Sequence, residues 1–149
     1  MIRVQEGPFD VGAEIAALSA GRTDIGAIAS FVGLVRDQAG DEAIGAMTLE
    51  HYPGMTEKKL AEIEAEAGAR WPLQASLIVH RYGRMLPGEP IVLVATASQH
   101  RAAALEACAF LIDWLKTEAP FWKLEETGEN QRWVEARAAD DRAAARWRR

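Results

Sequence analysis

The sequence predicts an α+β fold with a mixed, largely antiparallel sheet. Strand-like segments are interspersed with three main helical segments, without the regular alternation of strand and helix that is typical of parallel sheets. Of the 149 residues, 49% are hydrophobic and 26% are charged, which is ordinary for a globular domain with a real core. Because no repeat, linker or low-complexity segment interrupts the chain, we expect a single domain over residues 1–149.

The first part of the chain alternates between strand and helix patterns. Residues 2–5 form a short strand candidate, and Asp10 is placed to cap a helix over residues 11–18. Residues 25–35 are rich in small and β-branched side chains, which predicts a strand.

A strand and a helix follow on either side of a Pro-Gly turn. Residues 47–52 alternate in the manner of a strand. We expect Thr56 to cap the next helix, whose apolar residues recur at helical spacing until Trp71 and Pro72 end it.

Two further strands, over residues 77–82 and 91–97, precede the longest predicted helix. This helix covers about residues 101–116. Its apolar stripe consists of Ala104, Leu105, Cys108, Leu111, Ile112 and Leu115. After it, residues 121–125 and 132–136 predict short strands around a turn at 127–130, and Asp140 opens an amphipathic tail.

Charge and cysteine content exclude several classes of protein. The formal net charge of -5 argues against general binding of nucleic acid, so an anion site must be a local cluster of basic residues. Cys108 is the only cysteine, which excludes an internal disulfide and a CxxC metal site. Since neither a leader-like N-terminus nor a membrane-length apolar run occurs, we expect a cytoplasmic protein that binds neither nucleic acid nor a membrane.

Two lysines are the strongest candidates for chemistry. The chain has 17 basic residues, and only Lys58, Lys59, Lys116 and Lys123 among them are lysines. Lys116 and Lys123 flank an apolar Pro-Phe-Trp segment. Arginine keeps its proton in proteins, whereas a partly desolvated lysine can act as an acid, a base or a nucleophile. A random pair of lysines is more often simply solvated, so the assignment needs support from other residues.

Arg36 and the pair His100-Arg101 are the candidates for binding an anion. The pair falls at a junction from strand to helix, where free backbone N–H groups and the positive end of the helix dipole favour a phosphate or carboxylate. Arg36 follows an apolar strand, where a guanidinium can grip a phosphate with two hydrogen bonds. Each is a weak signal alone, because such residues are often capping or solvated groups.

The other reactive side chains are expected to be structural. His51 precedes the Pro-Gly turn and His80 lies beside Arg81 on another strand, so we assign both histidines to packing. Cys108 lies on an apolar helix stripe and is expected to be an inert core residue. The histidines lack metal-ligand spacing and no phosphate-binding loop or dinucleotide motif occurs, so we expect neither a metal nor a nucleotide cofactor.

Two further classes of function stay open on these residues. A pure binding module would use the same cations to hold an acidic C-terminus or a nucleotide without turnover. A Schiff-base enzyme would use Lys116 or Lys123 as a nucleophile toward a small carbonyl compound, and borohydride would trap its imine.

Five segments together resemble the large, catalytic subunits of molybdopterin synthases, the MoaE family. They recur in the family's order and extend over almost the whole chain. The segments are FVGLVR at 31–36, LEHYPGM at 49–55, SQHR at 98–101, KTEAPFWK at 116–123 and RWV at 132–134.

The resemblance implies an α/β hammerhead-type fold, a homodimer, and a small ubiquitin-like sulfur-carrier subunit at each end of that dimer, which makes a heterotetramer. The C-terminal Gly-Gly tail of the small subunit, carried as a thiocarboxylate, would donate sulfur to cyclic pyranopterin monophosphate. Two transfers would form the dithiolene of molybdopterin.

The resemblance also implies roles for single residues. Lys116 and Lys123 become the catalytic pair. The substrate-binding positions become Leu34, Val35, Arg36, His100, Arg101, Lys116, Lys123, Leu124 and Glu125. Leu34 stands where the family often carries a lysine, so backbone contacts from Leu34 and Val35 are the form of binding to consider there.

Overall fold

The computed structural model describes residues 1–128, 130–134 and 138–148, and it has two main sheets and four helices in this part of the chain. Its helices are α1 (Val11–Ser19), α2 (Met55–Arg70), α3 (Arg101–Glu118) and α4 (Ala138–Ala145). The strands are β1 (Ile2–Gln5), β2 (Ala27–Leu34), β3 (Gln38–Ala39), β4 (Glu42–Ala43), β5 (Ala46–His51), β6 (Leu73–Arg81), β7 (Gly83–Met85), β8 (Pro90–Ser98), β9 (Phe121–Thr127) and β10 (Asn130–Val134).

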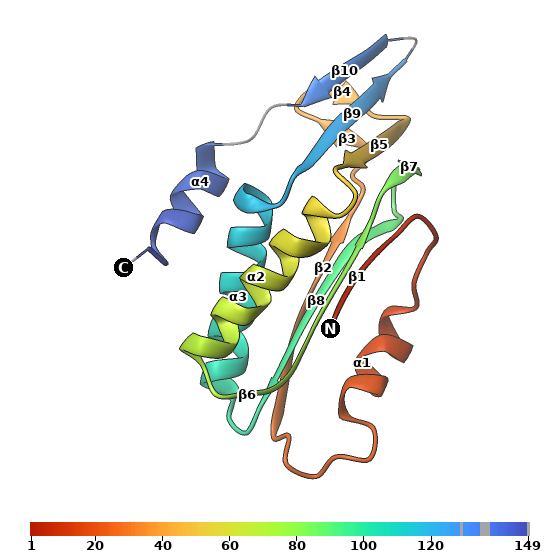
Figure 1. Cartoon of the computed structure of the whole chain (residues 1–149). Helices are drawn as coiled ribbons and strands as arrows, with labels where there is room; N and C mark the ends of the chain where they lie inside the picture. Colours follow the sequence, from red (N-terminus) through yellow and green to blue (C-terminus); the bar gives the residue numbers. More distant parts are fainter. Residues whose placement is uncertain (129, 135–137, 149) are drawn as a thin grey trace.

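The first sheet forms the centre of the molecule, with helices on both faces (Figure 1). Its strand order is β1-β6-β8-β2, in which β1 and β6 are parallel and the other two pairs are antiparallel. Helix α1 packs on one face, while α2 and α3 cover the other. The predicted α+β class with a mixed, largely antiparallel sheet is therefore confirmed.

The second sheet lies at one end of the first and is entirely antiparallel (Figure 1). Its order is β10-β9-β5-β7, and the two-residue strands β3 and β4 pair with each other beside it. The sequence patterns did not predict β3, β4 or β7, because strands this short show no alternation of polar and apolar residues.

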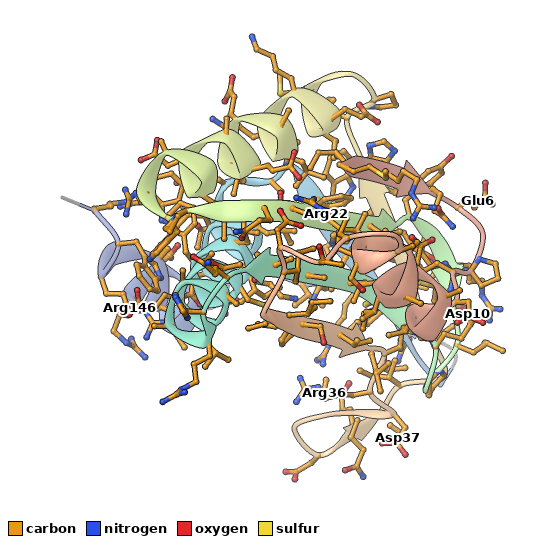
Figure 2. All side chains as sticks on the ribbon, turned by 90° about the horizontal axis from the view of Figure 1, so that it is seen from below. Glu6, Asp10, Arg22, Arg36, Asp37 and Arg146 are labelled. Atoms are coloured by element: carbon orange, nitrogen blue, oxygen red, sulfur yellow. The ribbon has the colours of Figure 1, made fainter. Side chains whose placement is uncertain are left out.

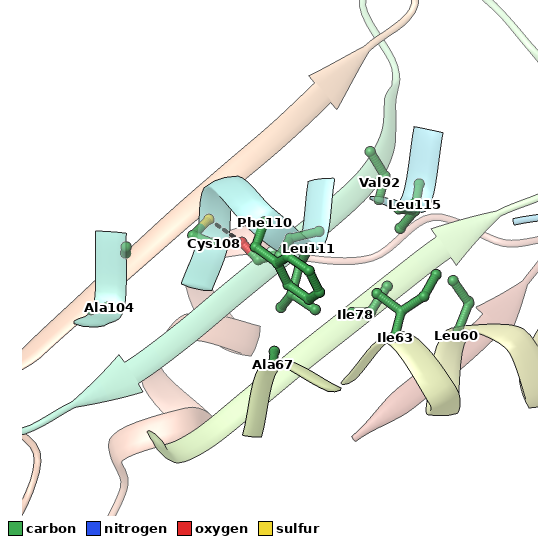
Figure 3. Packing of buried hydrophobic residues seen from close by; sticks show 12 residues of the cluster. Leu60, Ile63, Ala67, Ile78, Val92, Ala104, Cys108, Phe110, Leu111 and Leu115 are labelled. Atoms are coloured by element: carbon green, nitrogen blue, oxygen red, sulfur yellow. Dashed lines mark hydrogen bonds between the residues drawn. The ribbon is translucent and has the colours of Figure 1, made fainter. Parts of the chain in front are cut away.

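The main core fills the space between the first sheet and helices α2 and α3 (Figure 3). Its largest fully buried side chain is Phe110. The other members are Ala29, Leu60, Ile63, Ala67, Ile78, Val92, Val94, Ala104, Cys108, Leu111 and Leu115. Because the inner face of α3 is anchored here along its length, the C-terminal end of α3 has a fixed position relative to the first sheet.

Most of the predicted elements are confirmed, including the cap of α1. The Asp10 carboxylate accepts a hydrogen bond from the Ala13 N–H at 2.8 Å. Strands β9 and β10 are confirmed as a hairpin, although β9 runs on to Thr127 and β10 begins at Asn130. Residues 135 and 136 of the second predicted strand, and Glu129 of the turn, lie outside the described residues.

The prediction that Thr56 caps α2 is wrong. Gly54 is the N-cap, at a φ of 86° that favours glycine, and its N–H donates to the Glu57 carboxylate at 2.6 Å. Thr56 is fully buried in the first turn, where its hydroxyl donates to the Tyr52 carbonyl at 2.8 Å. The helix therefore begins earlier than the threonine suggested.

The predicted stripe of α3 is wrong at Leu105, whose side chain is 60% exposed. The buried face of α3 instead includes Ala107 and Phe110, which lie beside Ala104 and Leu111 around the helix. Hydrophobic spacing alone did not decide which residues next to Ala104 around the helix are buried. In the described part of the chain, no helix is long and apolar enough to cross a membrane.

Candidate active site

A cavity of about 260 Å³ lies where the end of α3 meets β9, and both Lys116 and Lys123 line it. Its other lining residues come from α3, β9 and the connection between them, and from five further elements. These residues are Leu49, His80, Ile91, Leu115, Ala119, Phe121, Trp122, Val134 and Asp140. The pairing of the two lysines in one site, which the sequence suggested, is present in the fold.

A short connection between α3 and β9 brings the two amines together. The N–H of Ala119 donates to the Leu115 carbonyl at 3.3 Å and ends the helix, and the Phe121 N–H donates to the Ala119 carbonyl at 2.9 Å. Lys116 lies in the last turn of α3, where the negative end of the helix dipole favours an ammonium group. Lys123 follows on β9, on the far side of this turn.

A second, smaller cavity of about 60 Å³ adjoins the first, and Lys123 lines both. Arg36 and Glu125 line it too, so three charged residues of the expected site meet here. Glu125 is 8% exposed and lies 3.5 Å from the Arg132 guanidinium. Arg36 itself lies at the outer end of β2, beside Asp37 (Figure 2). The two cavities share Lys123 and Ile91 in their linings, so the charged groups of both lie near one another.

Three of the expected site residues, Leu34, Val35 and Leu124, are apolar. Leu34 and Val35 line the smaller cavity. The N–H of Val35 donates to the Glu89 carbonyl and its carbonyl accepts from Gly88, so its backbone is engaged within the protein. Leu124 lies between Lys123 and Glu125 on β9, and strand alternation turns its side chain to the opposite face of the sheet.

The structure does not bring His100 and Arg101 to this site within one chain. His100 is the N-cap of α3 and Arg101 its first residue, whereas Lys116 is in the last turn of the same helix. At a rise of about 1.5 Å per residue, Arg101 and Lys116 are about 22 Å apart along the helix axis. Two separate clusters of basic residues therefore lie at opposite ends of α3.

His80 lies at the same cavity as the two lysines, although the sequence predicted only a packing role for it. It lies on β6, is 4% exposed, and lines the same cavity as Lys116 and Lys123. Burial, with a smaller contribution from the positive charges of Lys116, Lys123 and His51, lowers the pKa of His80 to about 3. The unfolded chain binds a proton on this ring below about pH 6.5, so stability contributed by neutral His80 is lost as the pH falls from there toward 3.

Three other side chains have structural roles, as the sequence predicted for His51 and Cys108. His51 contacts the Thr56 hydroxyl through Nδ1 at 2.9 Å and packs against the ring of Tyr82. Arg81 is buried and donates to the Glu6 carbonyl at 3.0 Å. Burial raises the pKa of the Cys108 thiol to about 11, which makes it a poor nucleophile.

The structure is an α+β fold with basic side chains gathered at two adjoining cavities. The chain belongs to the MoaE family, because the model of that family, the MoaE protein, matches residues 4–118.

Relatives of known name extend this similarity over nearly the whole chain. The molybdopterin synthase catalytic subunit of Pseudomonas aeruginosa is 58% identical over 146 residues, which cover 98% of this chain and 97% of the relative. The molybdopterin biosynthesis MoaE protein of Burkholderia ambifaria is 56% identical, with a TM-score of 0.84 and coverage of 99% and 97%. Molybdopterin synthase from Staphylococcus aureus is 29% identical, with a TM-score of 0.83 and coverage of 89% and 96%.

Proposed function

We propose that this chain catalyses sulfur transfer in the formation of molybdopterin, as the large subunit of a molybdopterin synthase acting in the cytoplasm. The sulfur donor is the C-terminal thiocarboxylate of a small ubiquitin-like subunit, and the acceptor is cyclic pyranopterin monophosphate. The observation that carries the proposal is the convergence of Lys116, Lys123, Arg36 and Glu125 on two adjoining cavities.

The two lysines suit this chemistry better than arginines. The thiocarboxylate sulfur attacks a substrate carbon and forms a C–S bond, while an oxygen leaves that carbon with the bonding electrons and takes up a proton. Lys116 and Lys123 stabilise the negative charges and supply that proton. Water then cleaves the bond between the acyl carbon and sulfur, which leaves a carboxylate on the small subunit and the sulfur on the substrate.

Among the described residues, the edge of β9 at Phe121 and Trp122 is where we place the tail of the small subunit. Strand β10 pairs with β9 from Lys123 onward, whereas Phe121 and Trp122 pair with β5 alone in the described register. An extended peptide can add to such an edge through main-chain hydrogen bonds. This placement would bring the end of the tail next to both lysines.

Arg36→Ala is expected to weaken binding of the pyranopterin by about tenfold or more, because the change removes a charge-assisted contact to the substrate phosphate. The effect should fall mainly on KM and only slightly on kcat, since the contact is present before the reaction starts. Isothermal titration with the pyranopterin and steady-state kinetics measure this. Unchanged affinity would remove the phosphate assignment from Arg36.

The distance between the two ends of α3 supports a site shared between two copies of the chain. If His100 and Arg101 anchor the same substrate that Lys116 acts on, they must come from a second copy, since about 22 Å separates them within one chain. A homodimer built with two-fold symmetry supplies both halves of each of its two sites.

Mixing two impaired variants tests this arrangement, with the pyranopterin well below KM so that the loss of an anchoring arginine lowers the rate. We expect Arg101→Ala and Lys116→Ala dimers, after subunit exchange, to recover about one quarter of the wild-type activity, because half of the dimers then carry one intact site. Arg36 and Lys116 line adjoining cavities of the same chain. Mixing Arg36→Ala with Lys116→Ala should therefore give no intact site, because every site then lacks one of these two side chains. No recovery in the first mixture, or a monomer of 16.3 kDa by light scattering, would contradict the shared site.

The function itself is tested by reconstitution. The chain is mixed with a thiocarboxylated small subunit and the pyranopterin, and formation of the dithiolene is measured. A complex without a sulfur-containing product would favour the pure binding module. An imine trapped by borohydride with a carbonyl compound would favour the Schiff-base enzyme instead.

A further inference from the structure

His80 has one defined protonation state in the cavity of the two lysines. Its Nδ1 lies 2.9 Å from the carbonyl oxygen of Arg81. Because a carbonyl oxygen can only accept a hydrogen bond, Nδ1 carries the proton of the neutral ring and Nε2 keeps its lone pair. The ring also stacks on Phe121 at a centroid distance of 3.8 Å and an angle of 15°, which fixes its plane.

Titratable groups from several elements lie near this ring. The cavity that His80 lines also contains Lys116 from α3, Lys123 from β9 and Asp140 from α4. His51 from β5 lies on the same ring of Phe121, at 5.9 Å. Arg36 and Glu125 line the adjoining cavity with Lys123. A protonated His80 would add a third positive charge beside two ammonium groups, whereas the neutral ring offers them an acceptor.

We propose that His80 is a positioning residue for the lysine pair, whose Nε2 accepts a hydrogen bond from the ammonium groups, Lys116 foremost, and holds them charged and oriented in the cavity. The proposal deepens the sulfur-transfer function and rests on it for its purpose. The Arg81 carbonyl and the Phe121 ring hold the imidazole of His80, which lines the cavity, and Nε2 is its one remaining hydrogen-bond acceptor. This role differs from the packing role of His51, whose Nδ1 contacts a hydroxyl.

The small number of lysines makes a direct test practical. The chain has four lysines, so spectra of protein labelled at the lysine Cε give four signals, and their pH titrations are read separately. Lys58 and Lys59 lie on α2, away from the cavity, and serve as internal references. The measurement uses the isolated chain and needs neither substrate nor partner.

Three substitutions at His80 separate the acceptor from packing. His80→Phe keeps an aromatic ring against Phe121 and loses the acceptor, and His80→Asn keeps only a donor near the Arg81 carbonyl. We expect both to lower the titration midpoint of Lys116 by about one pH unit, because an ammonium without its acceptor is destabilised. The amide oxygen of His80→Gln can reach the position of Nε2 and accept a hydrogen bond there. This variant should therefore return the Lys116 midpoint most of the way to its wild-type value. His51→Phe is the matched control and should leave Lys116 unchanged.

Two further measurements complete the test. Correlation spectra of the imidazole nitrogens in the wild-type chain should show the Nδ1-protonated neutral form of His80 at pH 7, even if a variant fails to fold. In the sulfur-transfer assay, His80→Asn should lower kcat by roughly 10- to 100-fold with little change in KM, the scale for misplaced catalytic groups.

The outcomes decide the proposal in both directions. Folded His80→Phe and His80→Asn variants with an unchanged Lys116 midpoint, or a wild-type ring protonated at Nε2, would overturn it. A shifted midpoint that His80→Gln restores would support it. If the wild-type chain shows no sulfur transfer while the titrations behave as expected, the proposed function fails and the positioning of the lysine stands.

Discussion

Replacing Lys116 or Lys123 by alanine should lower the turnover of sulfur transfer by about 100-fold or more, the usual scale for losing a positioned acid or an electrostatic group. Both amines line one cavity whose other walls are largely apolar, where water screens their charge poorly. Lys116→Arg and Lys123→Arg should restore little, because arginine keeps the charge but cannot release a proton and is bulkier. Steady-state kinetics with a saturating thiocarboxylated partner measure the loss.

Lys58→Ala is the matched control for the lysine substitutions. Lys58 is exposed on α2 and lines neither cavity, so its removal should leave turnover unchanged. Lys116→Ala should still fold and bind the small subunit, since the core does not depend on this side chain. Full activity in both arginine variants would indicate that positive charge alone matters, which would bring the pure binding module back into consideration.

Replacing Phe110 by alanine should reduce the free energy of unfolding by about 3–5 kcal/mol, which is typical of deleting a buried phenylalanine. The ring is fully buried, with its centroid 5.3 Å from that of Trp71 and 4.7 Å from that of Trp114. The guanidinium carbon of Arg70 also lies 4.8 Å from the centroid. Denaturation in urea at constant protein concentration measures the change.

Leu105→Ala on the same helix is the control for this stability prediction. Because Leu105 is 60% exposed, its truncation should change the free energy of unfolding by no more than about 0.5 kcal/mol. A large loss at Leu105 would show that a second copy or a partner covers this side chain. A loss below about 1 kcal/mol at Phe110 would contradict the described packing of the core.

Local patterns predicted the elements well where one signal dominated. Asp10 caps α1 as expected, and Cys108 lies in the core because it shares a helical face with Ala104, Leu111 and Leu115. The predictions for Thr56 and Leu105 were wrong for the same reason. A threonine near a helix start fits the pattern of an N-cap, and a leucine beside an apolar stripe fits the pattern of a buried residue. Only tertiary packing decides which residue caps the helix and which side chains are buried.

The site was predictable only in part. The positions of Lys116 and Lys123 around the Pro-Phe-Trp segment made both lysines candidates for chemistry, and in the fold both line one cavity. Helix length placed Arg101 far from Lys116, a separation that motif resemblance alone did not reveal. His80 carried no usable signal, because a single histidine in an apolar strand looks like a packing residue until the cavity beside it is known.

A single-turnover experiment tests the central claim most directly. The chain is mixed with excess thiocarboxylated small subunit, cyclic pyranopterin monophosphate is added, and the sulfur-containing product is followed in time for the wild type and for a Lys116→Ala, Lys123→Ala double variant. Titration of the small subunit into each protein runs alongside. We expect the double variant to bind the partner normally and to convert the substrate at least about 100-fold more slowly. Conversion by the double variant at a rate close to that of the wild type would contradict the assignment of sulfur transfer to this cavity.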